Sequence, residues 1–291
     1  MHKNLFIFGY GFSSKAIARE ARVQFNSIYG TTRNPDKAER LSSQGVSGLV
    51  FDGINTSNEV QLALRESTHM LISIAPGEAD PVLETIGNKL SHFCPNLQWI
   101  GYLSTVGVYG NHDGAWIDEE TEPKPVSKRS KQRVAAENEW KRITEKMDIP
   151  LAVFRLSGIY GPGRNTFTTI EAGRSRRLVK PGQVFNRIHS DDIGSAVASA
   201  IKNNIPGIFN ITDNEPAPPQ DLITLAHELM GKTPPPEMDF ETADITPMAR
   251  SFYGENKRVR NQKSKDILGM EYKWPDYRTA LTRMWEAGSW K

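Results

Sequence analysis

Short apolar runs alternate with longer amphipathic segments along the first half of the chain. The apolar runs lie at residues 5–8, 27–31, 49–51, 70–74, 99–103 and 151–156. They are nearly continuous in apolar character, which is typical of strands that helices cover on both faces. Apolar residues at helical spacing occur in segments 13–24, 37–43, 59–65, 81–93 and 127–146. This pattern predicts stacked βαβ units, and therefore an α/β fold with a doubly wound parallel sheet.

Composition and charge narrow the class of protein. The 291 residues are 38% hydrophobic and 24% charged, which excludes a disordered or low-complexity chain. Lys and Arg exceed Asp and Glu by 36 to 34, so bulk charge favours neither a nucleic-acid nor a membrane partner. Cys94 is the single cysteine, and the six histidines show no metal-binding spacing. The run at residues 5–8 is too short for a signal sequence, so we expect a cytoplasmic protein without a metal.

A glycine-containing turn follows the first predicted strand. Gly9 and Gly11 match the first two glycines of a G-x-G-x-x-G turn, and Phe12 and Ser13 would begin the next helix. Ser14 stands where the third glycine is usual, which weakens the match. Such a turn binds a pyrophosphate through the amides of the helix N-terminus, although it can also be an ordinary strand-to-helix corner.

The end of the second predicted strand carries a hydroxyl and a guanidinium. Thr32 and Arg33 stand where an acidic residue would bind the ribose 2′-hydroxyl of NAD. Because arginine binds a phosphate through paired charge-assisted hydrogen bonds, this segment favours NADP, with NAD as the second possibility. The alternative is that Arg33 is a solvated residue before the next helix, which Asn34 would cap.

Two later strand ends offer weaker cofactor candidates. Asp52 follows the third strand and is placed to reach an adenine, while Ala75 and Pro76 follow the fourth and could form a wall. Ligands of open α/β sheets bind along this edge. Ordinary turn residues are a nearly equal alternative at all three positions.

The second half of the chain is less regular. It contains a glycine-rich loop near residue 161, a basic stretch at 174–180, a strand-like piece at 183–188 and a helical segment at 191–202. Proline clusters at 216–219 and 234–236 flank another helix, at 221–230. We predict a Rossmann-type dinucleotide-binding domain from residues 1–160 with 183–210. A smaller substrate-binding region would take residues 161–182 with 211–291.

Three ordered motifs resemble the extended short-chain dehydrogenase/reductase superfamily, also described as the NAD-dependent epimerase/dehydratase superfamily. They are Ser-Thr-Val-Gly-Val-Tyr-Gly at 104–110, Arg-Leu-Ser-Gly-Ile-Tyr-Gly-Pro-Gly-Arg at 155–164, and Arg-Ile-His-Ser-Asp-Asp-Ile at 187–193. Segments 209–216 and 256–259 are similar to the atypical YeeZ-like branch. The resemblance implies a Rossmann fold, a nicotinamide cofactor and a small-molecule substrate.

Active members of that superfamily carry a Tyr-x-x-x-Lys pair on the helix after the fifth strand. When Lys131 is aligned with the lysine, Ser127 takes the place of the tyrosine, and an aliphatic hydroxyl is a poor proton donor. The resemblance implies that Ser104 orients the substrate and that Lys131 binds the nicotinamide ribose. Tyr109 and Tyr160 could each supply a phenol or only an aromatic wall. A solvated Lys131 and a backbone-bonded Ser104 are the structural alternatives.

Two further clusters are explained by structure as well as by function. His189 precedes two aspartates at a predicted helix start, where capping accounts for all three residues. The cations Arg174, Arg176, Arg177 and Lys180 could bind an anionic substrate group, but solvation is the better explanation.

Two functions follow. The first is an NADP-dependent oxidoreductase or epimerase-like enzyme that acts on a small polar substrate without the usual tyrosine. The alternative is a non-catalytic dinucleotide-binding redox sensor or assembly partner, which the replacement by Ser127 favours. The resemblance also implies a homodimer formed through the helices at 81–93 and 127–146.

Overall fold

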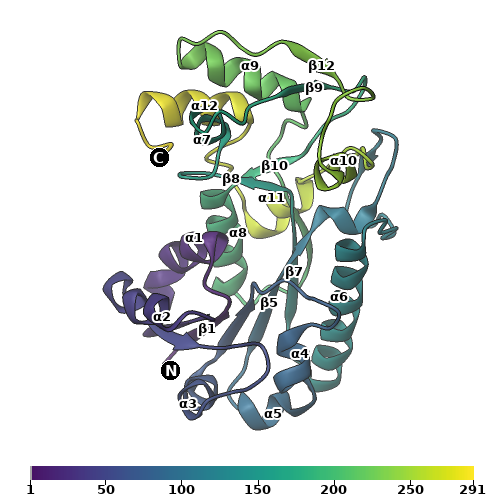
Figure 1. The fold of residues 1–291 in the computed structure, drawn as a ribbon. Helices are drawn as coiled ribbons and strands as arrows, with labels where there is room; N and C mark the ends of the chain where they lie inside the picture. Colours follow the sequence, from purple (N-terminus) through teal and green to yellow (C-terminus); the bar gives the residue numbers. More distant parts are fainter. Residues whose placement is uncertain (1) are drawn as a thin grey trace.

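A seven-stranded parallel sheet forms the centre of the computed structural model, which describes residues 2–291 apart from the side chains of residues 248 and 249 (Figure 1). Its strands are β1 (Asn4–Phe8), β2 (Ser27–Thr32), β3 (Ser47–Val50), β4 (His69–Ile72), β5 (Trp99–Thr105), β7 (Leu151–Leu156) and β11 (Gly207–Ile211). The order across the sheet is β3-β2-β1-β4-β5-β7-β11. The predicted doubly wound sheet is confirmed. The strand order reverses between β1 and β4, where ligands of such folds bind.

Helices cover both faces of the sheet. One face packs against α1 (Phe12–Ala21), α2 (Pro35–Leu41), α8 (Ser190–Lys202) and α11 (Gln262–Leu268). The other packs against α3 (Asn58–Glu66), α4 (Pro81–Ile86), α5 (Leu90–Phe93) and α6 (Lys128–Met147). Successive side chains of β1 enter opposite cores: Leu5 lies in the first cluster and Phe6 in the second. Both faces of the strand are thus apolar, as the continuous runs indicate.

Helices α1 and α8 approach each other closely because a glycine lies at their contact. A Cβ atom added to Gly194 of α8 would lie 2.8 Å from the backbone oxygen of Ala16 in α1. A larger residue at this position would push the two helices apart. Helix α2 begins as predicted, since the Asn34 side chain accepts a hydrogen bond from the amide of Lys37.

A second lobe stands over the carboxyl edge of the sheet (Figure 1). It contains two strand pairs, β8 (Gly158–Tyr160) with β10 (Arg187–His189) and β9 (Arg177–Val179) with β12 (Glu237–Asp239). Its helices are α7 (Thr166–Glu171), α9 (Pro219–Leu229), α10 (Pro247–Phe252) and α12 (Tyr277–Glu286). A further pair joins β6 (Trp116–Ile117) to β13 (Arg258–Val259). Residues such as Phe167, Leu222 and Tyr277 give the lobe its own apolar core.

Three expectations differ from the structure. The helix expected over residues 81–93 is interrupted by a 3-10 turn at Gly87–Lys89, so it becomes α4 and α5. Of the strand expected at 183–188, only the last part belongs to β10. After residue 260 the chain also returns from the second lobe to the sheet. Leu268 and Met270 pack in the apolar core between the sheet and the helices α1 and α8. The predicted smaller region, which takes all of residues 211–291, therefore includes a segment that belongs with the sheet.

The described residues contain no helix suited to cross a membrane and no cluster of metal-binding side chains. Among the helices of that part of the chain, none combines the length and the apolar character needed to cross a membrane. Likewise, none of the described residues form a group of three or more His, Cys, Asp and Glu side chains that could hold a metal ion.

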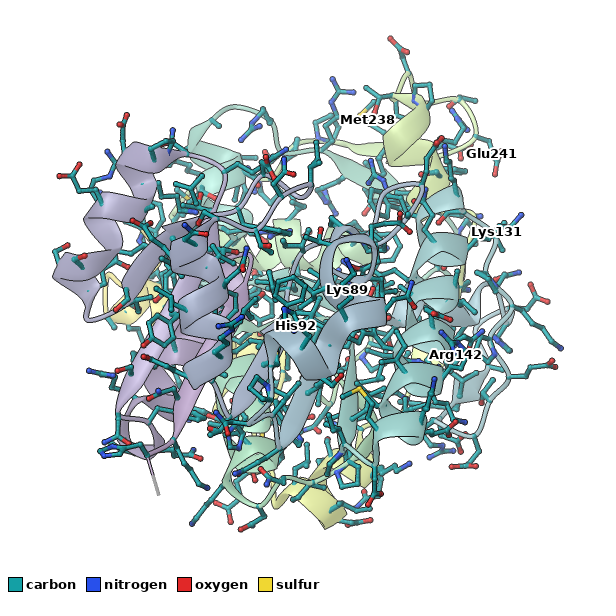
Figure 2. The ribbon with its side chains drawn as sticks, turned by 90° about the horizontal axis from the view of Figure 1, so that it is seen from below. Lys89, His92, Lys131, Arg142, Met238 and Glu241 are labelled. Carbon is teal, nitrogen blue, oxygen red and sulfur yellow. The ribbon has the colours of Figure 1, made fainter. Side chains whose placement is uncertain are left out.

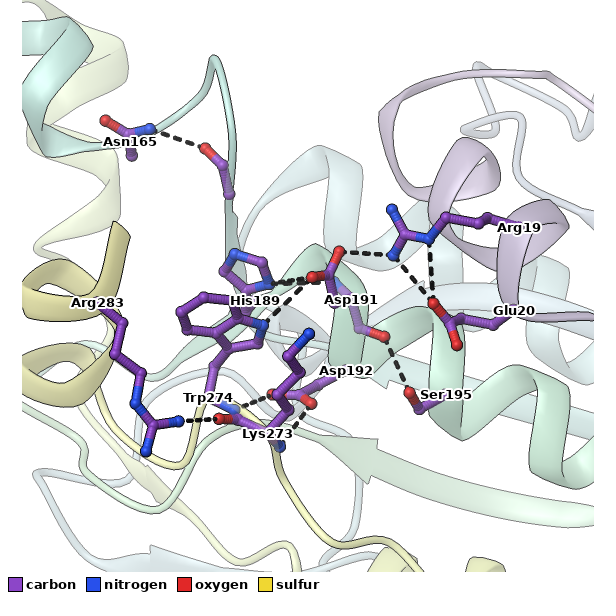
Figure 3. Close-up of polar contacts among 11 residues, drawn as sticks. Arg19, Glu20, Asn165, His189, Asp191, Asp192, Ser195, Lys273, Trp274 and Arg283 are labelled. Carbon is purple, nitrogen blue, oxygen red and sulfur yellow. Dashed lines mark hydrogen bonds and ion pairs between the residues drawn. The ribbon is translucent and has the colours of Figure 1, made fainter. Parts of the chain in front are cut away.

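A polar junction around His189 joins α1, α8 and the C-terminal segment (Figure 3). The Nδ1 atom of His189 accepts a hydrogen bond from the Asp191 amide at 3.1 Å and so caps α8. The imidazole stacks on Trp274 with ring centroids 4.3 Å apart. Asp191 also accepts a hydrogen bond from Arg19 of α1 at 2.8 Å. The neighbouring Asp192 accepts the backbone amides of both Lys273 and Trp274, so the C-terminal segment is held against the start of α8.

Burial of His189 makes the junction sensitive to acid. Burial lowers the pKa of His189 to about 4, although nearby Asp191 opposes this shift. Because an unfolded histidine has a pKa near ~6.5, the unfolded chain binds more protons between these two values. The stability that the neutral imidazole provides is therefore present above pH ~6.5 and is lost as the pH falls toward 4. His69 is also buried, its pKa is also lowered to about 4, and it acts in the same direction.

We predict that His189→Asn reduces the acid sensitivity of the protein. Asparagine keeps a capping acceptor but does not titrate. The free energy of unfolding, measured by urea titration at pH 7.5 and pH 4.5, should fall less in the variant, by about 1–3 kcal/mol. Equal losses in both proteins between the two pH values would show that His189 does not contribute to the acid response.

Candidate active site

The turn after β1 has the geometry of a phosphate-binding loop. Gly9 has a φ of +85°, and a Cβ atom there would lie 2.8 Å from Cγ1 of Ile74. Gly11 has an extended backbone, and no atom lies within 4 Å of the position of its Cβ. The first glycine therefore makes the tight turn, and the second leaves open space above the backbone. The hydroxyl of Ser14 donates to the Gly9 oxygen at 2.8 Å, so this serine closes the turn at the third-glycine position.

The N-terminus of α1 is free to bind an anion. Gly11 is its N-cap, no side chain caps it, and its first turn contains no acidic residue. The first backbone hydrogen bond of the helix runs from the Lys15 amide to the Gly11 oxygen. The amides of Phe12 and Ser13 thus have no acceptor among the described residues and lie at the positive end of the helix dipole.

Arg33 lies exposed at the carboxyl end of β2, beside Thr32. It forms no hydrogen bond or ion pair with any residue from 2 to 291 that the structure describes. The Thr32 hydroxyl accepts a hydrogen bond from the Asn34 amide at 3.3 Å. The preceding Thr31 supports the phosphate loop, because its hydroxyl accepts the Gly9 amide at 2.9 Å. The loop and the predicted 2′-phosphate residues are therefore joined directly.

Asp52 is engaged in its own turn. Its carboxylate accepts the amides of Ile54 at 2.8 Å and Asn55 at 2.9 Å. The hydrogen bonds from Asn55 and Ile54 lower the pKa of this exposed carboxyl. The local geometry therefore corresponds to the turn-residue alternative, and a contact with an adenine stays a prediction.

A cavity of about 1520 Å³ lies between the carboxyl edge of the sheet and the second lobe. From the sheet side it is lined by Ala75 and Pro76 after β4, Thr105 at the end of β5 and Leu156 at the end of β7. From the second lobe it is lined by Tyr160, Arg187 and Tyr277, among others. The segment after β4 thus borders both this cavity and Gly9, so the phosphate loop and the cavity share one edge of the sheet.

Ser104 and Tyr109 do not reach the cavity, which corrects their predicted catalytic roles. The Ser104 hydroxyl is buried and donates to the carboxylate of Glu137. The Tyr109 hydroxyl is also buried and donates to Oδ1 of Asn210 at 2.8 Å. Burial raises the pKa of Tyr109 to about 12. Because side chains alternate along a strand, the residue of β5 that lines the cavity is Thr105.

Lys131 also lies outside the cavity. It is exposed on the outer side of α6 (Figure 2). The residues of α6 that line the cavity at a spacing of four are Arg129 and Arg133. Ser127 borders the cavity as the N-cap of α6 and accepts the amide of Ser130 at 3.1 Å. Ser127 and Lys131 therefore do not face the cavity together as predicted. The face of α6 that lines the cavity carries Arg129 and Arg133 instead.

A buried ion pair sets the orientation of α6. Arg155 of β7 and Glu137 of α6 are 3% and 6% exposed, and their charged atoms lie 2.7 Å apart. The Arg155 guanidinium also lies over the ring of Tyr109, 4.8 Å from its centroid. Ser104 and Tyr109 thus belong to the polar network below the cavity floor, which explains their place in the motif without a catalytic role.

Most side chains of the basic stretch after α7 contact other residues of the protein and do not line the cavity. Arg176 donates to the Asp244 oxygen, Arg177 pairs with Glu237 at 2.6 Å, and Lys180 donates to the Tyr253 oxygen. Only Arg174 of this group lines the cavity. Arg187 and Tyr277 also line the cavity, although the sequence did not identify them as site residues. The motif at 187–193 contained the signal for Arg187, whereas Tyr277 is isolated in the sequence.

Known proteins resemble the chain in sequence and in fold. The model of the NAD dependent epimerase/dehydratase family matches residues 90–212. A structure of a functionally unknown conserved protein from Silicibacter pomeroyi is 44% identical, with a TM-score of 0.90, over 99% of this chain and 100% of that one. A dTDP-glucose 4,6-dehydratase from Bacillus anthracis, in complex with NAD, is 16% identical with a TM-score of 0.77, over 99% and 96% of the two chains.

A 3-diazoavenalumate denitrifying reductase from a Streptomyces species is 24% identical over 161 residues. The match covers 52% of each chain, so this chain spans about half the length of that curated relative. A human epimerase family protein, solved with NADPH, is 15% identical with a TM-score of 0.73, over 97% and 99% of the two chains.

We predict that Glu137→Ala lowers the free energy of unfolding by about 3–5 kcal/mol, because it leaves the Arg155 charge buried without a partner. Glu139→Ala is the matched control on the same helix, since Glu139 forms an exposed pair with Arg142. It should leave stability nearly unchanged. The double variant Glu137→Leu/Arg155→Met should recover most of the loss. Denaturant unfolding tests all three variants, and similar small losses for Glu137 and Glu139 would contradict the role of the buried pair.

Proposed function

We propose that the chain is an NADP-preferring oxidoreductase or epimerase-like enzyme of the NAD dependent epimerase/dehydratase family, whose model matches residues 90–212. Its substrate would be a small polar molecule held in the cavity above the sheet. The segments at 209–216 and 256–259 lead us to place it in the YeeZ-like branch. The curated relative, which is named as a reductase, supports an oxidoreductase.

The phosphate loop is the observation that carries this proposal. Gly9 makes its turn against Ile74, space is open above Gly11, and the first amides of α1 have no acceptor in the part of the chain that the structure describes. This arrangement fits the pyrophosphate of a dinucleotide, which would bind at Gly9, Gly11, Phe12 and Ser13. The Bacillus anthracis structure with NAD and the human structure with NADPH support a nicotinamide dinucleotide.

Arg33 supports the preference for NADP. Its guanidinium is exposed, and it has no partner among the described residues. It lies at the end of β2, where the ribose 2′-position of a bound dinucleotide would lie. Thr32 offers a neighbouring hydroxyl, and neither side chain repels a phosphate. Ala75 and Pro76 would form a wall along the cofactor toward the cavity. When bound, the cofactor supplies the hydride chemistry, and the chain supplies position and electrostatics.

The reaction would proceed without a tyrosine from α6. This helix contains no tyrosine, and its cavity face carries arginines. The cavity is lined by Tyr160, Tyr253 and Tyr277, but burial raises the pKa of each, to about 12 for Tyr277. A group that holds its proton this firmly is a weak general acid near neutral pH. Water in the open cavity is the proton source that we propose.

The cavity face of α6 also favours a second candidate function. An arginine is protonated at all ordinary pH values and cannot exchange a proton as a tyrosine and lysine pair does. A protein of this kind could bind a dinucleotide without turnover and act as a redox sensor or an assembly partner. We further propose a homodimer through α4, α5 and α6, which the superfamily resemblance suggests.

We predict that Arg33→Ala weakens binding of NADPH by about tenfold or more, because it removes a charge-assisted hydrogen bond worth ~1.5–3 kcal/mol. Binding of NADH should stay within about twofold, since NADH has no 2′-phosphate. Arg40→Ala changes another exposed arginine, on α2, and should affect neither cofactor. Fluorescence titration measures all four affinities. Equal losses for NADPH and NADH in Arg33→Ala would refute the assignment.

We predict that the purified protein oxidises bound NADPH when a panel of small polar carbonyl compounds is added, as followed by the NADPH absorbance. Stable NADPH occupancy, visible as a raised melting temperature, without consumption by any compound would favour the sensor instead. A protein partner whose affinity differs between NADPH and NADP+ would then support that function.

A further inference from the structure

The cavity face of α6 presents two arginines whose donors are largely unused. Arg129 is exposed and forms no hydrogen bond or ion pair with any residue in the described part of the chain. Arg133 donates one nitrogen to the Leu103 oxygen and lies over the ring of Tyr102, 5.7 Å from its centroid. Each guanidinium has five N–H donors, so most of them remain available.

Nearby carboxylates do not neutralise this pair. Asp80 is a buried acid whose charge interacts with that of Arg133. However, its Oδ1 caps α4 by accepting the amides of Val82 at 2.8 Å and Leu83 at 3.2 Å, and its Oδ2 accepts the Trp140 indole. Among the described residues, Asp80 and Arg133 form no ion pair within 4 Å. The acid therefore belongs to the α4 cap.

Cations outnumber acids among the other charged residues of the cavity wall. The cations that line it, apart from Lys257, are Lys128, Arg129, Arg133, Arg164, Arg174 and Arg187. Glu255 is the one acid among the described lining residues, and it pairs with Lys257 at 2.6 Å. Lys128 has an exposed partner in Glu78 at 3.3 Å. The charge of Arg187 is opposed by the nearby buried Asp213. The excess positive charge of the lining is therefore carried by Arg129, Arg133, Arg164 and Arg174, and it concentrates anions within the cavity.

The fold fixes the part of α6 that carries the arginine pair. Arg129, Arg133 and Glu137 follow one another at intervals of four residues, so they share one face of α6. Glu137 is fixed by the buried Arg155, and the N-terminus of α6 is fixed by the Ser127 cap. The helix N-terminus adds its partial positive charge beside Arg129. The backbone positions of both arginines are therefore fixed before a ligand binds.

We propose that Arg129 and Arg133 form an oxyanion-binding subsite that holds a carboxylate or phosphate group of the substrate. The ligand class is a small organic anion, because the planar guanidinium matches both groups through paired hydrogen bonds. The assignment of the cavity to the substrate rests on the proposed function. In this role the pair orients the substrate and does not transfer a proton.

The test uses malonate and inorganic phosphate as probes, at constant ionic strength and with saturating NADP+ to occupy the phosphate loop. Binding is measured by calorimetry for the wild type, Arg129→Gln, Arg133→Gln and Lys131→Gln. Lys131→Gln is the matched control, because it removes a charge from the same helix outside the cavity. We expect Arg129→Gln and Arg133→Gln to weaken binding of at least one probe by about tenfold, which is ~1.4 kcal/mol each, and Lys131→Gln by less than about twofold.

The probe that responds distinguishes a carboxylate from a phosphate subsite. The proposal is overturned if the wild type binds neither probe, if Arg129→Gln binds as the wild type does, or if Lys131→Gln loses as much affinity. Should Arg133→Gln unfold because its contact with Leu103 is lost, the exposed Arg129→Gln still decides the outcome. Repeating the titrations without NADP+ separates the two proposals. If the protein does not bind NADPH but still binds a probe through the two arginines, only the proposed function is refuted.

Discussion

The buried ion pair between Arg155 and Glu137 is the interaction on which the site depends. Two opposite charges lie together inside the protein, 2.7 Å apart, and removing either would leave the other unpaired in a medium of low dielectric constant. The pair links β7 to α6 and fixes the rotation of this helix about its axis. Arg133 lies about one turn and Arg129 about two turns before Glu137 on the same face, so the ion pair also decides which charges enter the cavity.

The two sides of the site are built by different means. The dinucleotide side is made mainly of backbone: a left-handed Gly9, an open Gly11 and the free amides of α1. Such a site tolerates much sequence change, and even the third glycine is replaced by Ser14, whose hydroxyl bonds the Gly9 oxygen. The substrate side is made of side chains from α6 and the second lobe. Its charge can therefore change while the fold remains, as fold similarity at 15–16% identity illustrates.

Some residues of the motif at 104–110 support the fold, and others line the cavity. Ser104 and Tyr109 lie in the motif that begins at the end of β5, yet their hydroxyls donate hydrogen bonds to Glu137 and Asn210 inside the protein. Thr105, which lies in the same motif, lines the cavity, whereas Ser104 and Tyr109 do not. Similarly, His189 caps α8 and stacks on Trp274. Buried polar side chains must find partners, and here those partners join the sheet, the helices and the C-terminal segment.

The sequence by itself determined the features that depend on local pattern. Continuous apolar runs predict buried parallel strands, the Gly9–Gly11 spacing predicts the turn, and Asn34 predicts a helix start. Strands of two or three residues in the second lobe are too short to show a period. Only the tertiary structure placed Lys131 outside the cavity and Arg133 within it. Which face of a polar helix such as α6 turns toward the sheet is set by the residues that it packs against. For α6 this residue is Arg155 of β7, which lies 18 residues after its partner Glu137 in the sequence.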